Sequence, residues 1–403
     1  MNRTSRKLFG ALAFSIVAGL LPVEARADAG FKKWINGFYA TAAQNGISQK
    51  TYNQAFAGVS EPDDFVLEKA RYQPEFKSQI WDYLDSRVNP YTVKVGREMA
   101  AKYGPTLAAI ERHFGVDKNI LLAIWSMESN YGAALETPER LHHVPRALAT
   151  LAYADPKRSK YAQKQLIAAL KMLQSGNVTS KGLMGSWAGA MGHTQFIPSS
   201  YLLYAVDADG NGKKDIWHSV PDALATSANL LQKNDWQTGK TWGYEIVVPA
   251  GGAAHAGKTK TLAQWAALGF TRPSGKGFKN GTERAELKMP GGPNGPGFLM
   301  TKNFFVIKRY NAADSYALAV GMLADEIAGY GGVQQAWPRP HNSLDIKEKF
   351  ELQARMQELG YYDGKIDGNF GSGSKAAIEA IQSRLGMSVD GQPSRVLLDA
   401  LRN

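Results

Sequence analysis

A single carboxylate stands out near the end of an apolar helical segment. The stretch LLAIWSMESNYG, residues 121–132, has apolar residues at helical spacing and carries one acid, Glu128. On a helix, Ile124 and Trp125 share the face of Glu128, because side chains three and four residues apart are neighbours. Apolar surroundings raise the pKa of a carboxyl group, as a general acid acting on a glycosidic oxygen requires. A lone glutamate near a helix end is more often an ordinary surface residue, so this pattern alone does not establish catalysis.

A second segment combines small residues with an amide. The sequence GSWAGAMGHTQFIPSSYLLYA, residues 185–205, contains Gly185, Gly189 and Gly192, followed by Gln195. Small residues let a backbone approach a ligand closely, and an amide can hydrogen-bond to a sugar hydroxyl or acetamido group. A glycine-rich turn that binds nothing would have the same composition, so the spacing leaves both interpretations open.

Together, the two segments resemble a known enzyme family. ESNYG at 128–132, GAMGHTQFIPSSY at 189–201, and Tyr310-Asn311 followed by Tyr316 resemble the lytic murein transglycosylases of the membrane-bound transglycosylase B family. The resemblance covers about residues 30–330 and implies a lysozyme-like fold. It also implies cleavage, without water, of the β-1,4 bond between N-acetylmuramic acid and N-acetylglucosamine. Glu128 would protonate the leaving oxygen and then take the proton of the muramyl C6 hydroxyl, which closes a 1,6-anhydro ring.

The same resemblance implies a set of substrate-binding groups in the groove. Carried over position by position, they are Ser186, Gln195, Tyr310, Asn311 and Tyr316. Packing in the core is the alternative role for the two tyrosines. Where close relatives have an aromatic residue after Asn229, this chain has Leu230, which puts one stacking contact of the groove in doubt.

An aspartate-rich loop offers oxygen ligands for a cation. In DADGNGKKDIWH, residues 207–218, positions 1, 3, 5 and 9 of an EF-hand loop are occupied by Asp207, Asp209, Asn211 and Asp215, with Gly212 at position 6. Position 12, where calcium requires a bidentate carboxylate, is His218. We therefore expect weak calcium binding with a structural role. A metal-free turn is the alternative, and the reaction itself is expected to need no cofactor.

Helical periodicity from Phe31 to about Tyr330 predicts the elements that position these residues. The segments 243–252 and 297–311 are rich in β-branched and aromatic residues and predict short strands, while the glycine- and lysine-rich residues between 251 and 297 predict mostly loop. The predicted fold class is mainly α (α+β), a lysozyme-like helical domain with a small β-rich insertion.

The chain divides into four predicted parts. Residues 1–27 have basic residues, an apolar run and an A-x-A sequence, which predict a signal peptide cleaved after Ala27. Residues 28–330 form the predicted catalytic domain, and 331–343, without periodicity and with two prolines, a linker. Residues 344–403, with LQARMQELGYYDGKIDGNFG, resemble the peptidoglycan-binding domain of cell-wall hydrolases. Two similar turn segments, YYDGKIDGNFG and MSVDGQPS, predict an internal half-repeat there.

Composition indicates where the protein acts. The apolar run of the leader is shorter than the ~20 residues that span a bilayer, and the chain has no cysteine for a disulfide or a lipid anchor. A formal net charge of +11 suits an acidic polymer, but no interleaved basic and aromatic motif supports nucleic-acid binding. We expect a soluble periplasmic protein without a transmembrane anchor, whose partner is the glycan strand of peptidoglycan. A muramidase-like hydrolase and a non-catalytic wall-binding protein are the alternatives.

Overall fold

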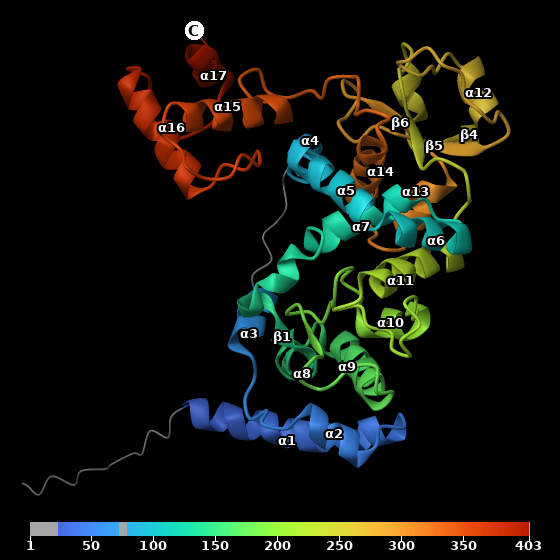
Figure 1. Cartoon of the computed structure of the whole chain (residues 1–403), viewed down its shortest axis with the longest axis vertical. Helices are drawn as coiled ribbons and strands as arrows, with labels where there is room; N and C mark the ends of the chain where they lie inside the picture. The colour runs from blue at the N-terminus through green and yellow to red at the C-terminus, as the bar shows by residue number, and fades with distance from the viewer. Residues whose placement is uncertain (1–22, 72–78, 403) are drawn as a thin grey trace, which may run out of the picture.

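The computed structural model describes residues 23–71 and 79–402. As predicted, the chain is mostly helical, with a small sheet beside the helices (Figure 1). Of the predicted signal peptide, residues 1–22 lie outside the described residues, and the first helix, α1, begins at Val23. Within the described part of the chain, no helix has the length and apolar character needed to cross a membrane.

The N-terminal helices pack against the middle of the chain. These elements are α1 (Val23–Gln44), α2 (Gln49–Ala55), α3 (Asp64–Arg71), α8 (Val144–Ala154) and α9 (Ser159–Gln174). Helix α1 buries Phe31, Ile35, Phe38 and Ala42, which recur every three or four residues and so form one face. Helices α1 and α3 contact α8, and α2 contacts α9, so this layer supports the two helices that precede the glycine-rich segment.

The central layer surrounds one almost entirely buried helix. Its elements are α4 (Ile80–Arg87), α5 (Pro90–Lys102), α6 (Gly104–Phe114), α7 (Lys118–Ser129), α10 (Pro198–Tyr204), α11 (Val220–Lys233) and α14 (Asp314–Ala328). Residues 120–126 of α7 are all buried, and α7 contacts α5, α6, α11 and α14. A helix that is apolar on all sides belongs in a core, so the position of its last turn is firmly fixed.

The sheet is antiparallel and has the strand order β3-β6-β5-β4. Its strands are β3 (Gly243–Ile246), β4 (Thr259–Thr261), β5 (Arg284–Lys288) and β6 (Gly297–Met300). A separate two-stranded pairing joins β1 (His142–His143) to β2 (Met184–Gly185), directly before the glycine-rich segment. The predicted small β-rich insertion is confirmed.

One finer prediction in this region is confirmed and one is wrong. Most of residues 251–297 are turns and irregular loop, as predicted, although they also contain β4, β5 and the helix α12 (Leu262–Ala267), whose Trp265 is fully buried. The strand predicted at 297–311 ends at Met300 and is followed by the helix α13 (Lys302–Ile307). Phe304 and Ile307, three residues apart, are both buried in α13, which contacts α14. Tertiary packing therefore overrides the β-preference of these residues.

The segment predicted as a linker lies folded on the catalytic domain. The ring of Trp337 stacks on that of Phe298, with 6.2 Å between centroids. The backbone and side-chain nitrogens of Gln335 both donate to Glu245 Oε1, over 2.8 and 3.1 Å. Residues 331–343 therefore fix the direction in which the chain leaves the catalytic domain.

A buried carboxylate on α4 anchors the C-terminal domain. Arg339 donates to both oxygens of Asp85, over 2.8 and 2.6 Å, and Lys349 Nζ lies 2.8 Å from Asp85 Oδ2. Asp85 is 6% exposed, so two cations compensate a charge that is removed from water. Lys349 belongs to α15 (Ile346–Glu358), and the pair therefore fixes the C-terminal domain against α4.

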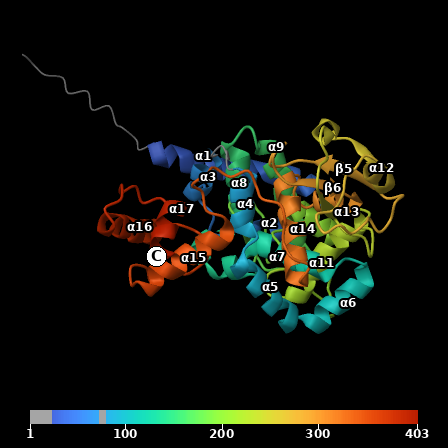
Figure 2. The same cartoon turned by 90° about the horizontal axis from the view of Figure 1, so that it is seen from above.

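The C-terminal domain contains two versions of one structural unit. Besides α15, it consists of α16 (Ser372–Arg384) and α17 (Arg395–Arg402) around its own apolar core. Gln353 Oε1 accepts hydrogen bonds from the backbone nitrogens of Asp367 and Gly368. In the same way, Gln382 Oε1 accepts from the backbone nitrogens of an Asp-Gly pair, residues 390–391. Figures 1 and 2 place this domain and the four-stranded sheet on opposite sides of the helical body.

Candidate active site

Glu128 lies in the last turn of α7, with its carboxyl group held by a tyrosine of α14. The hydroxyl of Tyr316 donates to Glu128 Oε1 over 2.6 Å. Burial raises the pKa of Glu128 to about 7, although the Tyr316 hydrogen bond and the positive charge of Arg87 both act to lower it. The carboxyl group is therefore divided between its two protonation states near neutral pH, which suits a group that first donates and then accepts a proton.

The chain turns sharply directly after this helix. Asn130, Tyr131 and Gly132 have positive φ angles of 49°, 56° and 93°. Two successive non-glycine residues in the left-handed region are strained, and such strain persists where surrounding contacts impose it. One of these contacts is the hydroxyl of Tyr131, which donates to the carbonyl of Thr92 over 3.0 Å. The sequence SNYG therefore ends α7 abruptly and leaves Glu128 at its end.

The glycine-rich segment packs directly on this turn through His193. Trp125 Nε1 lies 3.2 Å from His193 Nδ1, and the hydroxyl of Ser129 donates to the carbonyl of His193 over 2.5 Å. A Cβ atom on Gly132 would lie 2.6 Å from the imidazole ring, so glycine is required for this approach. The two segments singled out in the sequence therefore meet in space, and His193, which sequence analysis did not select, is the residue that joins them.

Tyr310 connects the same segment to α14. Its hydroxyl donates to the carbonyl of Thr194 over 2.6 Å and lies 3.2 Å from the hydroxyl of Ser227. Its ring is nearly parallel to that of Tyr316, with 6.5 Å between centroids. Burial raises the pKa of both tyrosines, and the charge of Glu128 adds to this effect, so both remain neutral hydrogen-bond donors. Tyr316 contacts Glu128, whereas Tyr310 holds the backbone of the glycine-rich segment.

The other predicted groove residues hold local turns. Ser186 Oγ accepts a hydrogen bond from the backbone of Ala190 over 3.1 Å. Gln195 has a positive φ of 50°, and its amide donates to the carbonyl of Gly192 over 2.9 Å. Asn311 is exposed, and its side chain accepts from a backbone nitrogen two residues later. Their roles in substrate binding stay predictions.

Arg87, at the end of α4, was not anticipated either. It acts on Glu128 through its charge, and its guanidinium lies 5.9 Å from the ring centroid of Tyr83. Arg87 and Tyr316 are the two side chains that act to lower the pKa of Glu128, against the effect of burial.

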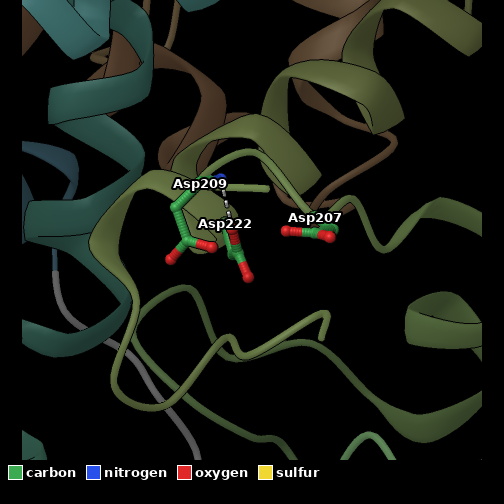
Figure 3. Close-up of side chains that lie close together, drawn as sticks. All are labelled: Asp207, Asp209 and Asp222. Atoms are coloured by element: carbon green, nitrogen blue, oxygen red, sulfur yellow. Dashed lines mark hydrogen bonds between the residues drawn. The ribbon is translucent and has the colours of Figure 1, made fainter. Parts of the chain in front are cut away.

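The acidic loop gathers three carboxylates, one of which lies outside the predicted set. Oxygens of Asp207, Asp209 and Asp222 lie within 4.8 Å of one another (Figure 3). Asp222 stands near the start of α11 and is fully buried, which raises its pKa. Asp215 is not part of this group, because its carboxylate contacts His218 Nδ1 at 3.0 Å.

Backbone N–H groups of the loop already donate hydrogen bonds to these carboxylates. Asp207 accepts from the backbone nitrogens of Gly210 and Gly212, each over 2.8 Å, and Asn211 Oδ1 accepts from Lys213. Asp222 accepts from three backbone nitrogens of the loop, at positions 208, 209 and 215. Asp207 Oδ2 and Asp222 Oδ2 each accept one hydrogen bond, which leaves a lone pair on each for a cation. Such hard oxygen donors fit calcium.

Comparison with known proteins assigns the chain to a family. The family model "Transglycosylase SLT domain" matches residues 30–325, and "Putative peptidoglycan binding domain" matches residues 350–401. The chain belongs to the transglycosylase SLT family. The predicted resemblance and the lysozyme-like fold class of this lytic transglycosylase are thereby confirmed. The C-terminal match confirms a peptidoglycan-binding domain.

Individual relatives agree with this assignment. The enzyme is 32% identical to membrane-bound lytic murein transglycosylase B of Escherichia coli (strain K12) over 251 residues, which are 61% of this chain and 66% of that protein. It is similar to SltB3 from Pseudomonas aeruginosa in complex with NAG-anhNAM-pentapeptide, with 40% identity, a TM-score of 0.72, and 93% and 99% of the two chains covered. The Escherichia coli lytic transglycosylase Slt35 in complex with calcium is 26% identical, with a TM-score of 0.62 over 75% of this chain and 93% of that one.

Proposed function

We propose that this lytic transglycosylase cleaves the β-1,4 bond between N-acetylmuramic acid and N-acetylglucosamine and leaves a 1,6-anhydromuramyl end. The observation that carries the proposal is the Glu128–Tyr316 pair, in which a partly buried carboxyl group with a pKa of about 7 accepts one hydrogen bond of 2.6 Å. The complex of SltB3 with NAG-anhNAM-pentapeptide supports an anhydromuramyl product.

One carboxyl group serves both halves of the reaction. Protonated Glu128 gives its proton to the glycosidic oxygen, and the bond to the muramyl C1 breaks. The resulting carboxylate takes the proton of the muramyl C6 hydroxyl, whose oxygen then bonds to C1. Tyr316 holds Oε1, so that Oε2 is the oxygen available for proton transfer. A pKa near the working pH favours both transfers.

The masses of the products test this proposal. Peptidoglycan sacculi treated with the purified enzyme should release muropeptides with an anhydromuramyl end, each lighter by one water than the hydrolysis product. Reducing muramic acid ends would instead show the muramidase-like alternative. If no glycan is cleaved, the remaining alternative is the non-catalytic wall-binding protein.

We also propose that Ser186, Gln195, Tyr310 and Asn311 line the sugar-binding groove. Gln195 and Ser186 belong to the segment that His193 fixes beside Glu128, and Tyr310 is bonded to Thr194 of the same segment. Leu230 is 6% exposed and packs in the core, so the aromatic contact expected from close relatives has no counterpart at this position.

The C-terminal domain is proposed to retain the enzyme on the wall, in the periplasm, after removal of residues 1–27. A chain that ends after Ser343 keeps Arg339 paired with Asp85, whereas ending it earlier would leave a buried charge without its main partner. The shortened chain should still cut soluble glycan but bind sacculi less, because tethering raises the local substrate concentration. Equal sacculus binding by both chains would refute the wall-binding role.

Catalysis is proposed to need no cofactor, with calcium confined to a structural role. The third carboxylate of the cluster is Asp222, and not Asp215 as predicted from the loop positions. Asp207 and Asp209 would share the cation with it and thereby fix the loop against α11. That Slt35 was obtained in complex with calcium supports this proposal.

A further inference from the structure

A pocket of about 300 Å³ lies between the catalytic and the C-terminal domain, at the end of α7 that carries Glu128. Met127 and Asn130, which flank Glu128 in the chain, belong to its lining, as does Arg87 of α4. The opposite wall consists of Lys365, together with two polar residues of the first Asp-Gly turn of the C-terminal domain. One side of the pocket thus belongs to the helices near Glu128, and the other side belongs to the C-terminal domain.

The pocket is separate from the predicted sugar groove. Ser186, Gln195 and Tyr310 are not among its lining residues. Its position is fixed, because the same helix that carries Arg87 also carries Asp85, the anchor of the C-terminal domain. A side pocket at the end of α7, apart from the predicted groove, suits a branch of the substrate better than its main strand.

The charged residues of the pocket indicate which chemical groups such a branch would carry. Arg87 and Lys365 contribute positive charge from opposite walls, and among the described residues neither side chain forms an ion pair. The one carboxylate of the lining, Asp367, is engaged by the backbone nitrogen of Asn369 over 2.9 Å. Asn130 and Ser126 add an amide and a hydroxyl. The pocket therefore favours an extended, hydrogen-bonding ligand with carboxylates.

We propose that this pocket binds the acidic stem peptide carried by the muramic acid at the cleavage site. In this proposal, the ammonium group of Lys365 forms an ion pair with a carboxylate of the peptide. The inference rests on the proposed function, since it takes peptidoglycan as the substrate. It adds a specificity determinant on the C-terminal domain, which thereby contributes to choosing the bond that is cut as well as to wall binding.

Binding of two product-like molecules tests the proposal without requiring turnover. NAG-anhNAM-pentapeptide and peptide-free NAG-anhNAM both lack the bond to be cut, so calorimetry with the full chain measures affinity alone. We expect the peptide-bearing molecule to bind at least several-fold more tightly, and the difference to shrink in high salt, because exposed charges are screened. Equal affinities of the wild type for both molecules would overturn the proposal.

Variants of one lysine assign the difference to this pocket. Lys365→Ala should remove most of the preference for the peptide-bearing molecule, and Lys365→Glu should remove all of it. Lys347→Ala removes the same charge from an exposed position on the same domain and should leave the preference intact. Equal weakening of both molecules by Lys365→Ala would mean that the pocket holds sugar, which contradicts the proposal. Unchanged melting temperatures show that the variants are folded, since the Lys365 side chain is exposed.

The proposed function can fail independently of this inference. Anhydromuramyl release from peptide-free glycan by the wild-type enzyme reports on the reaction alone. A protein that prefers the peptide-bearing molecule but releases no such product has the pocket without the proposed reaction. A protein that releases the product but shows no preference has the reaction without the pocket.

Discussion

Two partly buried carboxyl groups of this enzyme share a pKa of about 7 but differ in the donor that holds them and in the chain around them. Glu128, at the end of α7, accepts a hydrogen bond from the hydroxyl of Tyr316 and stands next to a strained turn. Asp325, nine residues after Tyr316 on α14, accepts one from Trp242 Nε1 over 3.1 Å and ties a strand end to the helix. Burial explains both pKa values, so a raised pKa does not by itself identify a catalytic acid. Among the residues that the structure describes, each carboxyl group also keeps one oxygen without a hydrogen bond. The feature that makes Glu128 the candidate is its position beside the strained turn and the glycine-rich segment.

The sharpest test exchanges each acid for its amide. Glu128→Gln keeps the size of the side chain but cannot donate or take a proton, and we expect cleavage of sacculi to fall by at least ~100-fold. Asp325→Asn should retain most of the activity, because the Trp242 contact needs an acceptor, not a proton. Release of anhydromuropeptides measures both. Comparable losses in the two variants would abolish the distinction between the two sites.

Removing the hydrogen-bond donors should affect the two sites differently. Tyr316→Phe deletes a bond that lowers the pKa of Glu128, so this pKa should rise. Since activity requires protonated Glu128, the alkaline limb of the pH–rate profile should move to higher pH, while looser orientation lowers the rate by roughly 10-fold. Trp242→Phe is the matched change at Asp325 and should not move the profile. An unshifted limb in Tyr316→Phe would show that the tyrosine does not act on the catalytic acid.

The variant Asp325→Asn isolates the contribution of Asp325 to the pH dependence of stability, which Glu128 shares. The pKa of Asp325 rises from 3.8 to about 7 on folding, so between these values the folded state binds a proton that the unfolded state has released. Stability due to this group is therefore greatest at acid pH and decreases as the pH rises toward 7. Asp325→Asn should reduce the fall in melting temperature between pH 5 and 8, on the order of 3 °C. An identical fall in variant and wild type would place Asp325 in contact with water.

The smallest expected effect concerns Asp222, a fully buried carboxylate whose neighbours Asp207 and Asp209 are themselves acids. Calcium should raise the melting temperature by a few degrees at millimolar concentration, since a ligand of the folded state at concentration c stabilises it by RT ln(1 + c/Kd). Asp222→Asn should reduce this rise, although it also lowers the starting value. Asp215→Asn should keep the rise, because that residue lies outside the cluster. If Asp215→Asn abolished the rise in melting temperature and Asp222→Asn did not, Asp215 would be the ligand, as predicted from the sequence.

The sequence was informative where chemistry lies in contiguous residues. The helical period placed Glu128 among apolar neighbours, and the family motifs supplied Tyr316. The hydrogen bond between them, however, spans 188 residues, and no local pattern encodes it. The second motif contains His193, but its role could not be predicted locally. That role consists of contacts with Trp125 and Ser129, which belong to the first motif.

The failures share one physical cause, which is that partners come from distant segments. The loop count stopped at His218, whereas Asp222 enters the cluster from the following helix. The residues of α13 have β-forming side chains but lie where α14 requires a helix. Arg339 belongs to a segment with the composition of a linker, and its partner Asp85 lies 254 residues earlier.

The paired glutamines of the C-terminal domain bear on its ancestry. Gln353 and Gln382 each close a loop by the same two bonds to an Asp-Gly pair, although the spacing from glutamine to aspartate differs between the halves. Duplication of a short gene segment, followed by drift in loop length, would leave this pattern. After such an event one copy is free to diverge, and here the first loop carries Lys365 toward the catalytic domain while the second retains the structural bonds alone. The peptidoglycan-binding domain would then have acquired the proposed contact with the stem peptide through divergence of one of its two duplicated units.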